Sequence, residues 1–496
     1  MADIVLTGDT SGAITVAAPA VAGTNTLTLP ATTGTVTITS TGGVDSNTGL
    51  GDGTFDANTT GANNVAVGKD ALRANTTASN NTAIGTKAGY SNTTGTSNVA
   101  VGREALYSNT NASFNTAVGM QSLTSNTTGA SNTAVGEAAL DANTTGGSNV
   151  AVGRDALGAN TTGSFNHAFG RNALLTNTTG QYNNAFGNEA LKVNTADGNS
   201  AFGHAALVAN TTGLYNTAVG YQALNSNTTA TFNVAVGYNA LRDNTGAENT
   251  ASGYQALRNN TTGAYNTALG RNALVLNTTA SSNTAVGNHA MYANTTGANN
   301  VALGYQALKT NTTSSYNTAV GRDALYNATG GSNTALGRNA ANNLTTGSNN
   351  TALGYTATPS SATVSNEFTL GNNNVTNLRC ADTTISALSD ARDKTNIQDI
   401  PLGLDFINQM RPVSFDWDRR DGTYKGKKDF GFIAQELKEI QDNTAYANHM
   451  RLVHEDNPEK LEADPMKTYP VLVKAIQELS AKVEELQTEI NTLKGN

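Results

Sequence analysis

The 496-residue chain has few of the residues that fill a globular core or build common binding sites. Aromatic residues make up 6% and charged residues 13% of the sequence, and there is one cysteine, Cys380. A single cysteine excludes an intrachain disulfide and argues against a cysteine-based metal site. The net charge of -8 offers no basic surface for nucleic acid. We therefore expect no nucleic-acid partner, no metal and no cofactor.

Long apolar runs and a large share of the usual prolines are also missing. No stretch approaches the roughly 20 apolar residues of a membrane-spanning helix, and the opening residues, MADIVLTGDTSG, do not resemble a secretory signal. We expect no membrane insertion, and assembly in a cytoplasm. Proline is absent from residues 31–358. An uninterrupted backbone ladder requires this absence, because proline has no N–H to donate.

What the chain does contain is a repeat close to NTAVG, two variable residues, AL, two more, then NTTG. It recurs eighteen times between Gly68 and Gly354. Successive repeat glycines are 17 residues apart in most copies, as from Gly68 to Gly85, and 16 residues apart in three copies. Such a period predicts a solenoid, in which each repeat is one coil stacked on the previous coil. The expected fold is therefore mainly β, a parallel β-roll.

The residues just before each repeat glycine predict a strand with two apolar faces. The residue two before the glycine is alanine in every copy, and the next is Val, Ile, Leu or Phe in all but Ser252. Neighbours on a strand point to opposite faces, so a second apolar face needs a partner chain. The pattern leaves open which face is interior. The pair Ala71 and Leu72, with its equivalents, predicts a second strand, and the NTTG segments predict turns.

Composition divides the chain into four parts. The range 389–496 holds more than half of the charged residues, the only tryptophan and five of the eight prolines. Short alternating runs near the N-terminus predict a small β module, at Ile14–Val16, Thr26–Leu29 and Val36–Ile38. The predicted parts are an N-terminal module and linker at 1–57, the roll at 58–358, a β connector at 359–388 and a second kind of domain at 389–496.

The repeats resemble the left-handed parallel β-roll in the head regions of trimeric bacterial adhesins, which carry a similar Ala/Val/Gly strand. The resemblance covers the whole range 58–358 and implies structure only. A cell-surface adhesin would also require a secretory signal and a β-strand membrane anchor. The NTT and NTS triplets match the glycosylation sequon, and the regular threonines leave an ice-binding face as a further alternative. We interpret both as turn chemistry.

Four motifs after the roll carry a more specific resemblance: LSDARDKTNI at 388–397, INQMRPVSFDWD at 407–418, DFGFIAQEL at 429–437 and YPVLVKAIQELSAKVEELQ at 469–487. Together they resemble the intramolecular chaperone and self-cleaving domain of phage tail fibres and tailspikes, the endosialidase type called peptidase S74. The match covers nearly all of the range 389–496 and implies a small α/β domain there. The N-terminal run GAITVAAPAVAGTNTLTLPATTGTV also resembles the start of phage fibre proteins.

This resemblance implies a mechanism with two catalytic residues. Ser389 matches the nucleophile and Lys394 the base, with cleavage between Leu388 and Ser389. A serine hydroxyl needs a proton acceptor within hydrogen-bond reach, and lysine can accept a proton only where burial favours its neutral form. Folding of the domain is expected to supply that burial. Asp390 and Arg392 match other points of the motif and are expected to hold the loop.

The third motif supports the same assignment through Asp429, Gln435 and Glu436. Many relatives carry a histidine two residues before the glycine of GFIAQE, where this chain has Asp429, so less efficient cleavage is expected. A chaperone that folds the fibre without cleaving it stays open as an alternative. So does a freestanding hydrolase, which should cut an added peptide.

The last helix predicts association. Six apolar residues at spacings of three and four form the seam of a coiled coil, within the range 469–496. Heptad rules alone favour a dimer, but the seam is short and the resembled family is trimeric. The alternative is a helix packed on its own domain. The six seam residues are Ile476, Leu479, Val483, Leu486, Ile490 and Leu493.

From the roll, the C-terminal motifs and the seam together, we expect a homotrimeric phage tail fibre. We expect it to attach to tail or baseplate proteins through its N-terminus and to bind a host glycan or outer-surface protein.

Overall fold

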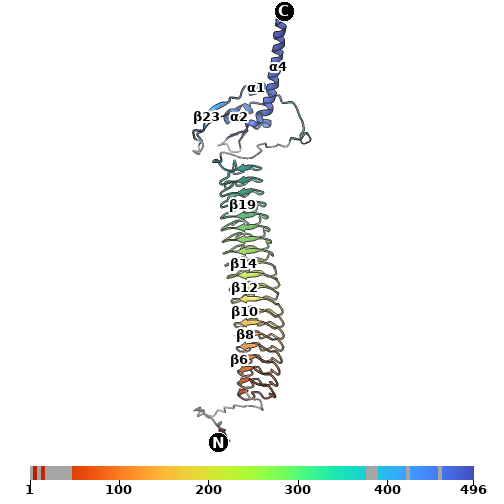
Figure 1. Cartoon of the computed structure of the whole chain (residues 1–496), viewed down its shortest axis with the longest axis vertical. Helices are drawn as coiled ribbons and strands as arrows, with labels where there is room; N and C mark the ends of the chain where they lie inside the picture. The colour runs from red at the N-terminus through yellow and green to blue at the C-terminus, as the bar shows by residue number, and fades with distance from the viewer. Residues whose placement is uncertain are drawn as a thin grey trace.

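The computed structural model describes residues 4–7, 13–16, 47–375, 389–419, 425–455 and 461–495. Its longest part is a rod of stacked coils, followed by a small domain of short strands and helices and by a projecting terminal helix (Figure 1). This arrangement confirms the predicted fold class, a mainly β parallel solenoid followed by a small α/β domain ending in a helix.

Each coil contributes one strand of three residues, and the twenty strands from β3 to β22 pair in sequence order. All these pairs are parallel and in register, so that Ala66 lies beside Ala83 and Ala83 beside Ala100. The ladder extends beyond residues 58–358 at both ends, because β3 pairs with β4 and β22 with β21. The strands are β3 (Thr48–Leu50), β4 (Val65–Val67), β5 (Thr82–Ile84), β6 (Val99–Val101), β7 (Thr116–Val118), β8 (Thr133–Val135), β9 (Val150–Val152), β10 (His167–Phe169), β11 (Asn184–Phe186), β12 (Ser200–Phe202), β13 (Thr217–Val219), β14 (Val234–Val236), β15 (Thr250–Ser252), β16 (Thr267–Leu269), β17 (Thr284–Val286), β18 (Val301–Leu303), β19 (Thr318–Val320), β20 (Thr334–Leu336), β21 (Thr351–Leu353) and β22 (Phe368–Leu370).

The structure decides which face of the strand is interior. The strand alanines, such as Ala66 and Ala117, are fully buried, and they pack with the alanines and leucines of the following turn. The larger residue after each alanine points outward: Ile84 is 41% exposed and Leu336 is 52% exposed in the single chain. Only a small side chain fits between the strand and the opposite wall of so narrow a coil.

The predicted second strand at Ala71 and Leu72 is wrong. These residues lie in a turn, and Leu72 has a left-handed backbone with φ of 47°, as do the equivalent leucines Leu106 and Leu157. The turn reverses the chain while keeping the leucine side chain inside the coil, fully buried in most repeats. Its N–H groups still bond to the next coil, as from Leu72 N to Ala88 O at 3.0 Å.

The repeat glycines occupy a position that excludes any side chain. Gly102 has φ of 132°, and an added Cβ would lie 2.5 Å from the carbonyl oxygen of Gly119 in the next coil. The conformation and the close approach of backbones both require glycine. This explains why every repeat has glycine at this position, although other positions of the repeat vary.

Two ladders of buried asparagines run along the roll. In the first, each amide bonds within its own turn and to the previous coil: Asn126 Nδ2 donates to Gly129 O at 2.9 Å and to Asn109 Oδ1 at 3.0 Å. In the second, each side-chain oxygen accepts the backbone N–H of the next coil, as from Asn132 N to Asn115 Oδ1 at 2.9 Å. The NTTG segments were predicted to form turns. The continuous coil-to-coil ladders were not predicted.

The first ladder is interrupted at the three shortened coils. Their turns, Asn194–Asn199, Asn244–Asn249 and Ala328–Asn333, each lack one residue. The asparagine of the preceding coil then has a buried side-chain oxygen with no hydrogen-bond partner among the described residues. These three are Asn177, Asn227 and Asn311.

The N-terminal region is described only in part. Strand β1 (Ile4–Thr7) pairs antiparallel with β2 (Ala13–Val16), which contains the first predicted run. The predicted runs at 26–29 and 36–38 lie outside the described residues, as does Cys380.

The C-terminal domain packs around a small core made by Phe406, Leu437, Leu452 and Val471. Helix α4 begins in this core and then extends away from it (Figure 1). Glu478 of α4 accepts a hydrogen bond from Leu404 N at 2.7 Å, which ties α4 to α1. The elements are η1 (Ala391–Asp393), α1 (Leu404–Ile407), β23 (Val413–Asp416), β24 (Lys428–Gly431), α2 (Ala434–Asp442), α3 (Ala447–Met450), β25 (Val453–His454), β26 (Glu462–Ala463), η2 (Pro465–Thr468) and α4 (Tyr469–Lys494).

Candidate functional site

The two residues predicted to be catalytic are in direct contact. Lys394 Nζ lies 2.6 Å from Ser389 Oγ and 3.2 Å from the carbonyl oxygen of Ser389. The short helix η1 lies between them and reverses the chain, so that a lysine five residues away returns to the serine. The distance is within the reach required of a nucleophile and its base. Leu388, on the other side of the predicted cleavage site, lies outside the described residues.

The expected burial of this pair is absent from the single chain. Ser389, Lys394 and the whole segment to Pro401 are exposed. A lysine side chain acts as a base where its surroundings exclude water, and this segment is open to water. Folding of a single chain therefore leaves Lys394 uncovered, and its burial in an assembled fibre stays a prediction.

Asp390 and Arg392 hold the loop between the two catalytic candidates. Asp390 caps η1 by accepting Arg392 N at 2.9 Å, and its carboxylate also pairs with the Arg392 guanidinium, with Oδ2 2.5 Å from Nη2. These hydrogen bonds lower the pKa of the Asp390 carboxyl below its ordinary value. Both groups are exposed, so the pair orients the loop more than it stabilises the fold.

The three residues of the third motif lie on a different part of the domain. Asp429 is on β24 and accepts from Trp417 Nε1 at 3.2 Å. Glu436 on α2 forms an ion pair with Arg411, which lowers the pKa of the Glu436 carboxyl. Gln435 is an exposed residue of α2. Among the hydrogen bonds and ion pairs of the described residues, none joins these three to Ser389 or Lys394.

The pairing of Arg411 with Glu436 was not predicted. It joins the INQMRP segment to α2, through Arg411 Nε to Glu436 Oε2 at 3.1 Å and a second, shorter contact. The presence of both residues in separate motifs of one domain was the only available signal. Opposite charges in two motifs do not indicate a contact without knowledge of the fold.

Other kinds of site find little support in the described ranges. They contain no group of three or more His, Cys, Asp or Glu placed to hold a metal ion. None of the helices in those ranges is both long and apolar enough to cross a membrane.

Residues 389–446 match the peptidase S74 family, described as chaperone of endosialidase. The matched segment begins at Ser389 and includes the three motifs that contain Lys394, Arg411 and Glu436. No curated protein and no solved structure was found to match the chain. A chaperone-of-endosialidase domain placed after a long parallel β-solenoid fits a phage tail fibre with a C-terminal chaperone.

Proposed function

We propose that this chain is the subunit of a homotrimeric phage tail fibre for host attachment, and that its C-terminal domain cleaves the bond between Leu388 and Ser389 after assembly. The observation that carries the proposal is the contact between Ser389 and Lys394 inside the segment that matches the chaperone family. The roll then forms the shaft. The N-terminal module attaches to other tail or baseplate proteins of the virion, and the host partner is a surface glycan or protein.

Association of identical chains is supported by an apolar stripe on the outside of the roll. This outer stripe consists of the residue after the buried alanine in each strand. Three of its rings, Phe169, Phe186 and Phe202, stack at centroid distances of 4.5 and 4.9 Å. A stripe of this length exceeds the isolated exposed apolar residues normal on a monomer. A partner chain with the same coil spacing would cover it along its whole length.

The seam of α4 supports association independently. Its N-terminal residues Val471 and Ala475 are buried in the domain core, whereas Ile476, Leu486 and Leu493 are 64%, 56% and 77% exposed. The helix is therefore not simply packed on its own domain. A seam of this pattern buries its apolar residues against other helices. Helix α4 continues the long direction of the roll, which suits bundling of chains side by side (Figure 1).

Assembly also supplies a reason for delayed cleavage. The segment from Ser389 to Pro401 is uncovered in one chain, so the water-excluding surroundings that the reaction needs are missing there. A neighbouring subunit placed over this segment would remove water and favour the neutral amine. Ser389 Oγ would then pass its proton to Lys394 and attack the Leu388 carbonyl carbon. The C–N bond to Ser389 would break as its nitrogen takes up that proton, and water would hydrolyse the resulting ester to separate Leu388 from Ser389. Cleavage coupled to assembly would leave a shaft that cannot unfold by reversing its folding route.

The test compares the full chain with the Ser389→Ala variant by denaturing gel, intact mass and native mass. We expect a fragment ending at Leu388 from the wild type only, and a trimeric native mass for both proteins. A monomer would overturn the assembly proposal, and identical full-length chains in both would overturn self-cleavage.

The exposure of Lys394 favours one second candidate, a fibre whose chaperone domain is retained. In that case the domain still nucleates association through α4, but the Leu388–Ser389 bond persists. The same gel separates the two candidates, because only the first produces two fragments.

A further inference from the structure

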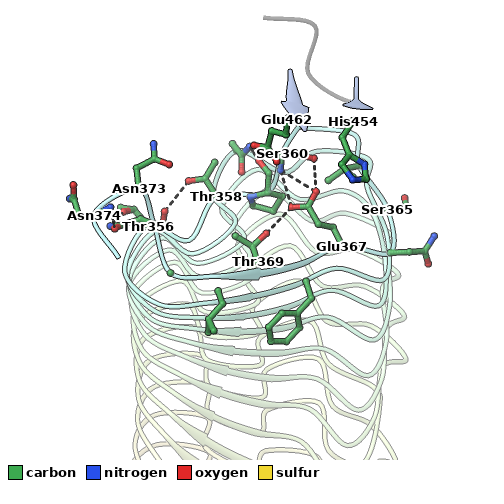
Figure 2. Close-up of a pocket in the computed structure, with 18 residues that line it drawn as sticks. Thr356, Thr358, Ser360, Ser365, Glu367, Thr369, Asn373, Asn374, His454 and Glu462 are labelled. Atoms are coloured by element: carbon green, nitrogen blue, oxygen red, sulfur yellow. Dashed lines mark hydrogen bonds between the residues drawn. The ribbon is translucent and has the colours of Figure 1, made fainter. Parts of the chain in front are cut away.

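A large cavity lies where the roll ends and the C-terminal domain begins. Its volume is about 1010 Å³, and its floor and sides come from the last coil, between Thr356 and Asn374. Figure 2 shows this coil below and the hairpin strands β25 and β26 above, which contribute His454 and Glu462. The cavity is distinct from the Ser389–Lys394 pair, since neither of those residues lines it.

At the floor of the cavity, the last coil departs from the repeat, and its polar side chains bond to one another and to the backbone. Glu367 stands where the second asparagine ladder would continue, and its N–H donates to Asn350 Oδ1 at 3.0 Å as the final rung. The Glu367 carboxylate accepts Ser360 N at 2.9 Å and Thr369 Oγ1 at 2.7 Å (Figure 2). These bonds join Ser360, Glu367 and Thr369 to one another at the end of the roll. A site organised in advance loses less entropy when a ligand binds.

The residues around this floor define what could bind. Among the described residues that line the cavity, two are carboxylates, Glu367 and Glu462, and none is a lysine or an arginine. An anionic ligand would therefore be repelled. Hydroxyl and amide groups such as those of Thr358 and Asn374 can both donate to and accept from ligand hydroxyls. Phe368, 63% exposed, adds an apolar ring to the same lining.

We propose that this cavity binds a neutral, hydroxyl-rich carbohydrate, and that the β25–β26 hairpin covers it until the C-terminal domain separates. The inference rests on the proposed function, because a host-attachment fibre requires a receptor site. Polar groups that fix hydroxyls beside one apolar ring are the usual combination in small-ligand sites. His454 and Glu462 follow Ser389 in the chain, so cleavage at that serine removes the covalent link between the cover and the floor.

The test uses the full chain with the Ser389→Ala substitution, which prevents self-cleavage. A recognition sequence for an added protease is inserted directly after Leu388. The cavity can then be opened on demand, whether or not the native chain cleaves itself. The probe is a printed array of neutral and acidic bacterial oligosaccharides, read before and after protease treatment. We expect binding to neutral members only, and at least about tenfold stronger after treatment.

Matched variants locate the binding. Phe368→Ala and Asn374→Ala should each weaken binding roughly tenfold in the opened protein. Phe114→Ala, a ring of the shaft that is 65% exposed, should leave it unchanged. Equal melting temperatures establish that the variants are folded. Binding to acidic members only, equal binding before and after cleavage, or equal effects of Phe114→Ala and Phe368→Ala would each overturn the inference.

Failure of the inference can be separated from failure of the proposed function by measuring adhesion of the opened fibre to a panel of bacterial strains. Adhesion without any binding to the neutral oligosaccharides would overturn the carbohydrate site and leave the fibre function standing. Absence of both would overturn the fibre function as well.

Discussion

Lys394 Nζ lies 2.6 Å from Ser389 Oγ, yet both side chains are exposed in the single chain. The two atoms are therefore close enough for proton transfer, but the water-excluding surroundings that the transfer needs are absent in one chain. Under the proposed function, this site becomes active only when a neighbouring subunit covers it, which would link its chemistry to assembly.

Replacement of Lys394 distinguishes a base from a structural donor. Lys394→Met should lower the cleavage rate at least about 100-fold, because general base catalysis typically contributes that much. Lys394→Arg keeps a positive donor beside Ser389 but cannot accept a proton, so it should fail equally. The measurement is the fraction cleaved over time on a denaturing gel, with native mass as the control for assembly. Substantial cleavage by the arginine variant would show that Lys394 only positions the serine.

Disruption of the α4 seam should reduce both association and cleavage. Leu479→Asp together with Leu486→Asp places charges on the apolar seam, and the Ser389–Lys394 pair would then stay uncovered. We expect a lower native mass and loss of the fragment ending at Leu388. Thr488→Asp adds a charge to an exposed position off the seam and serves as the control. Full cleavage by a monomeric double variant would contradict coupling between assembly and chemistry.

The first asparagine ladder predicts unequal costs for the same substitution. Asn126→Ala leaves Asn109 Oδ1 and Gly129 O without the amide that bonds both, and Asn143 Nδ2 without the oxygen that accepts from it. Each unsatisfied buried group costs about 1–3 kcal/mol. Asn311→Ala likewise frees Asn294 Oδ1 and Ser314 O, but Asn311 precedes a shortened coil and its side-chain oxygen accepts no hydrogen bond. Asn311→Ala should therefore destabilise the roll less than Asn126→Ala, with a difference of about 1 kcal/mol. Urea unfolding of the two variants measures the difference, and equal midpoints would argue against a role for the coil-to-coil bonds.

The glycine column should tolerate no side chain. Gly102→Ala places a Cβ against the Gly119 carbonyl in a left-handed conformation, and should cost on the order of 3 kcal/mol or more. Gly158 lies in a turn where the nearest atom to an added Cβ is 3.3 Å away. Gly158→Ala should therefore change the free energy of unfolding by less than about 1 kcal/mol. Thermal unfolding followed by circular dichroism compares the two, and similar melting temperatures would refute the steric explanation.

Asp141 predicts a pH dependence in the roll. Partial burial raises the pKa of its carboxyl above the ordinary 3.8, and the nearby Asp155 carboxylate adds to the effect. The folded state then holds this proton more tightly than the unfolded state, so stability falls as pH rises from 3.8 through the raised pKa. Asp141→Asn should raise the melting temperature at pH about 7 and lose this advantage below pH about 3. Glu137→Gln, at an exposed position of the same turn, is the control. A stability gain that persists unchanged at low pH would rule out titration of Asp141 as the cause.

Several features of the fold could be predicted from particular residues. The recurring glycines and the absence of proline from 31–358 indicated a coil stack with a continuous ladder. The four C-terminal motifs indicated Ser389 and Lys394. The failure at Ala71 and Leu72 has a simple reason: a buried apolar pair is compatible with a strand or with a turn whose leucine adopts a left-handed backbone. Residue type alone does not separate these conformations.

The sequence by itself determined the period of the solenoid and the strand before each repeat glycine, because these depend on local spacing and residue type. Its resemblance to a known family indicated the catalytic candidates. Tertiary structure alone decided that the alanine face is interior, that buried asparagines bond from coil to coil, and that Lys394 reaches Ser389 while staying exposed. It also decided that Glu367 closes the end of the roll beneath a cavity. These properties depend on which atoms meet across one coil length or more, and such distances are set only when the coils stack.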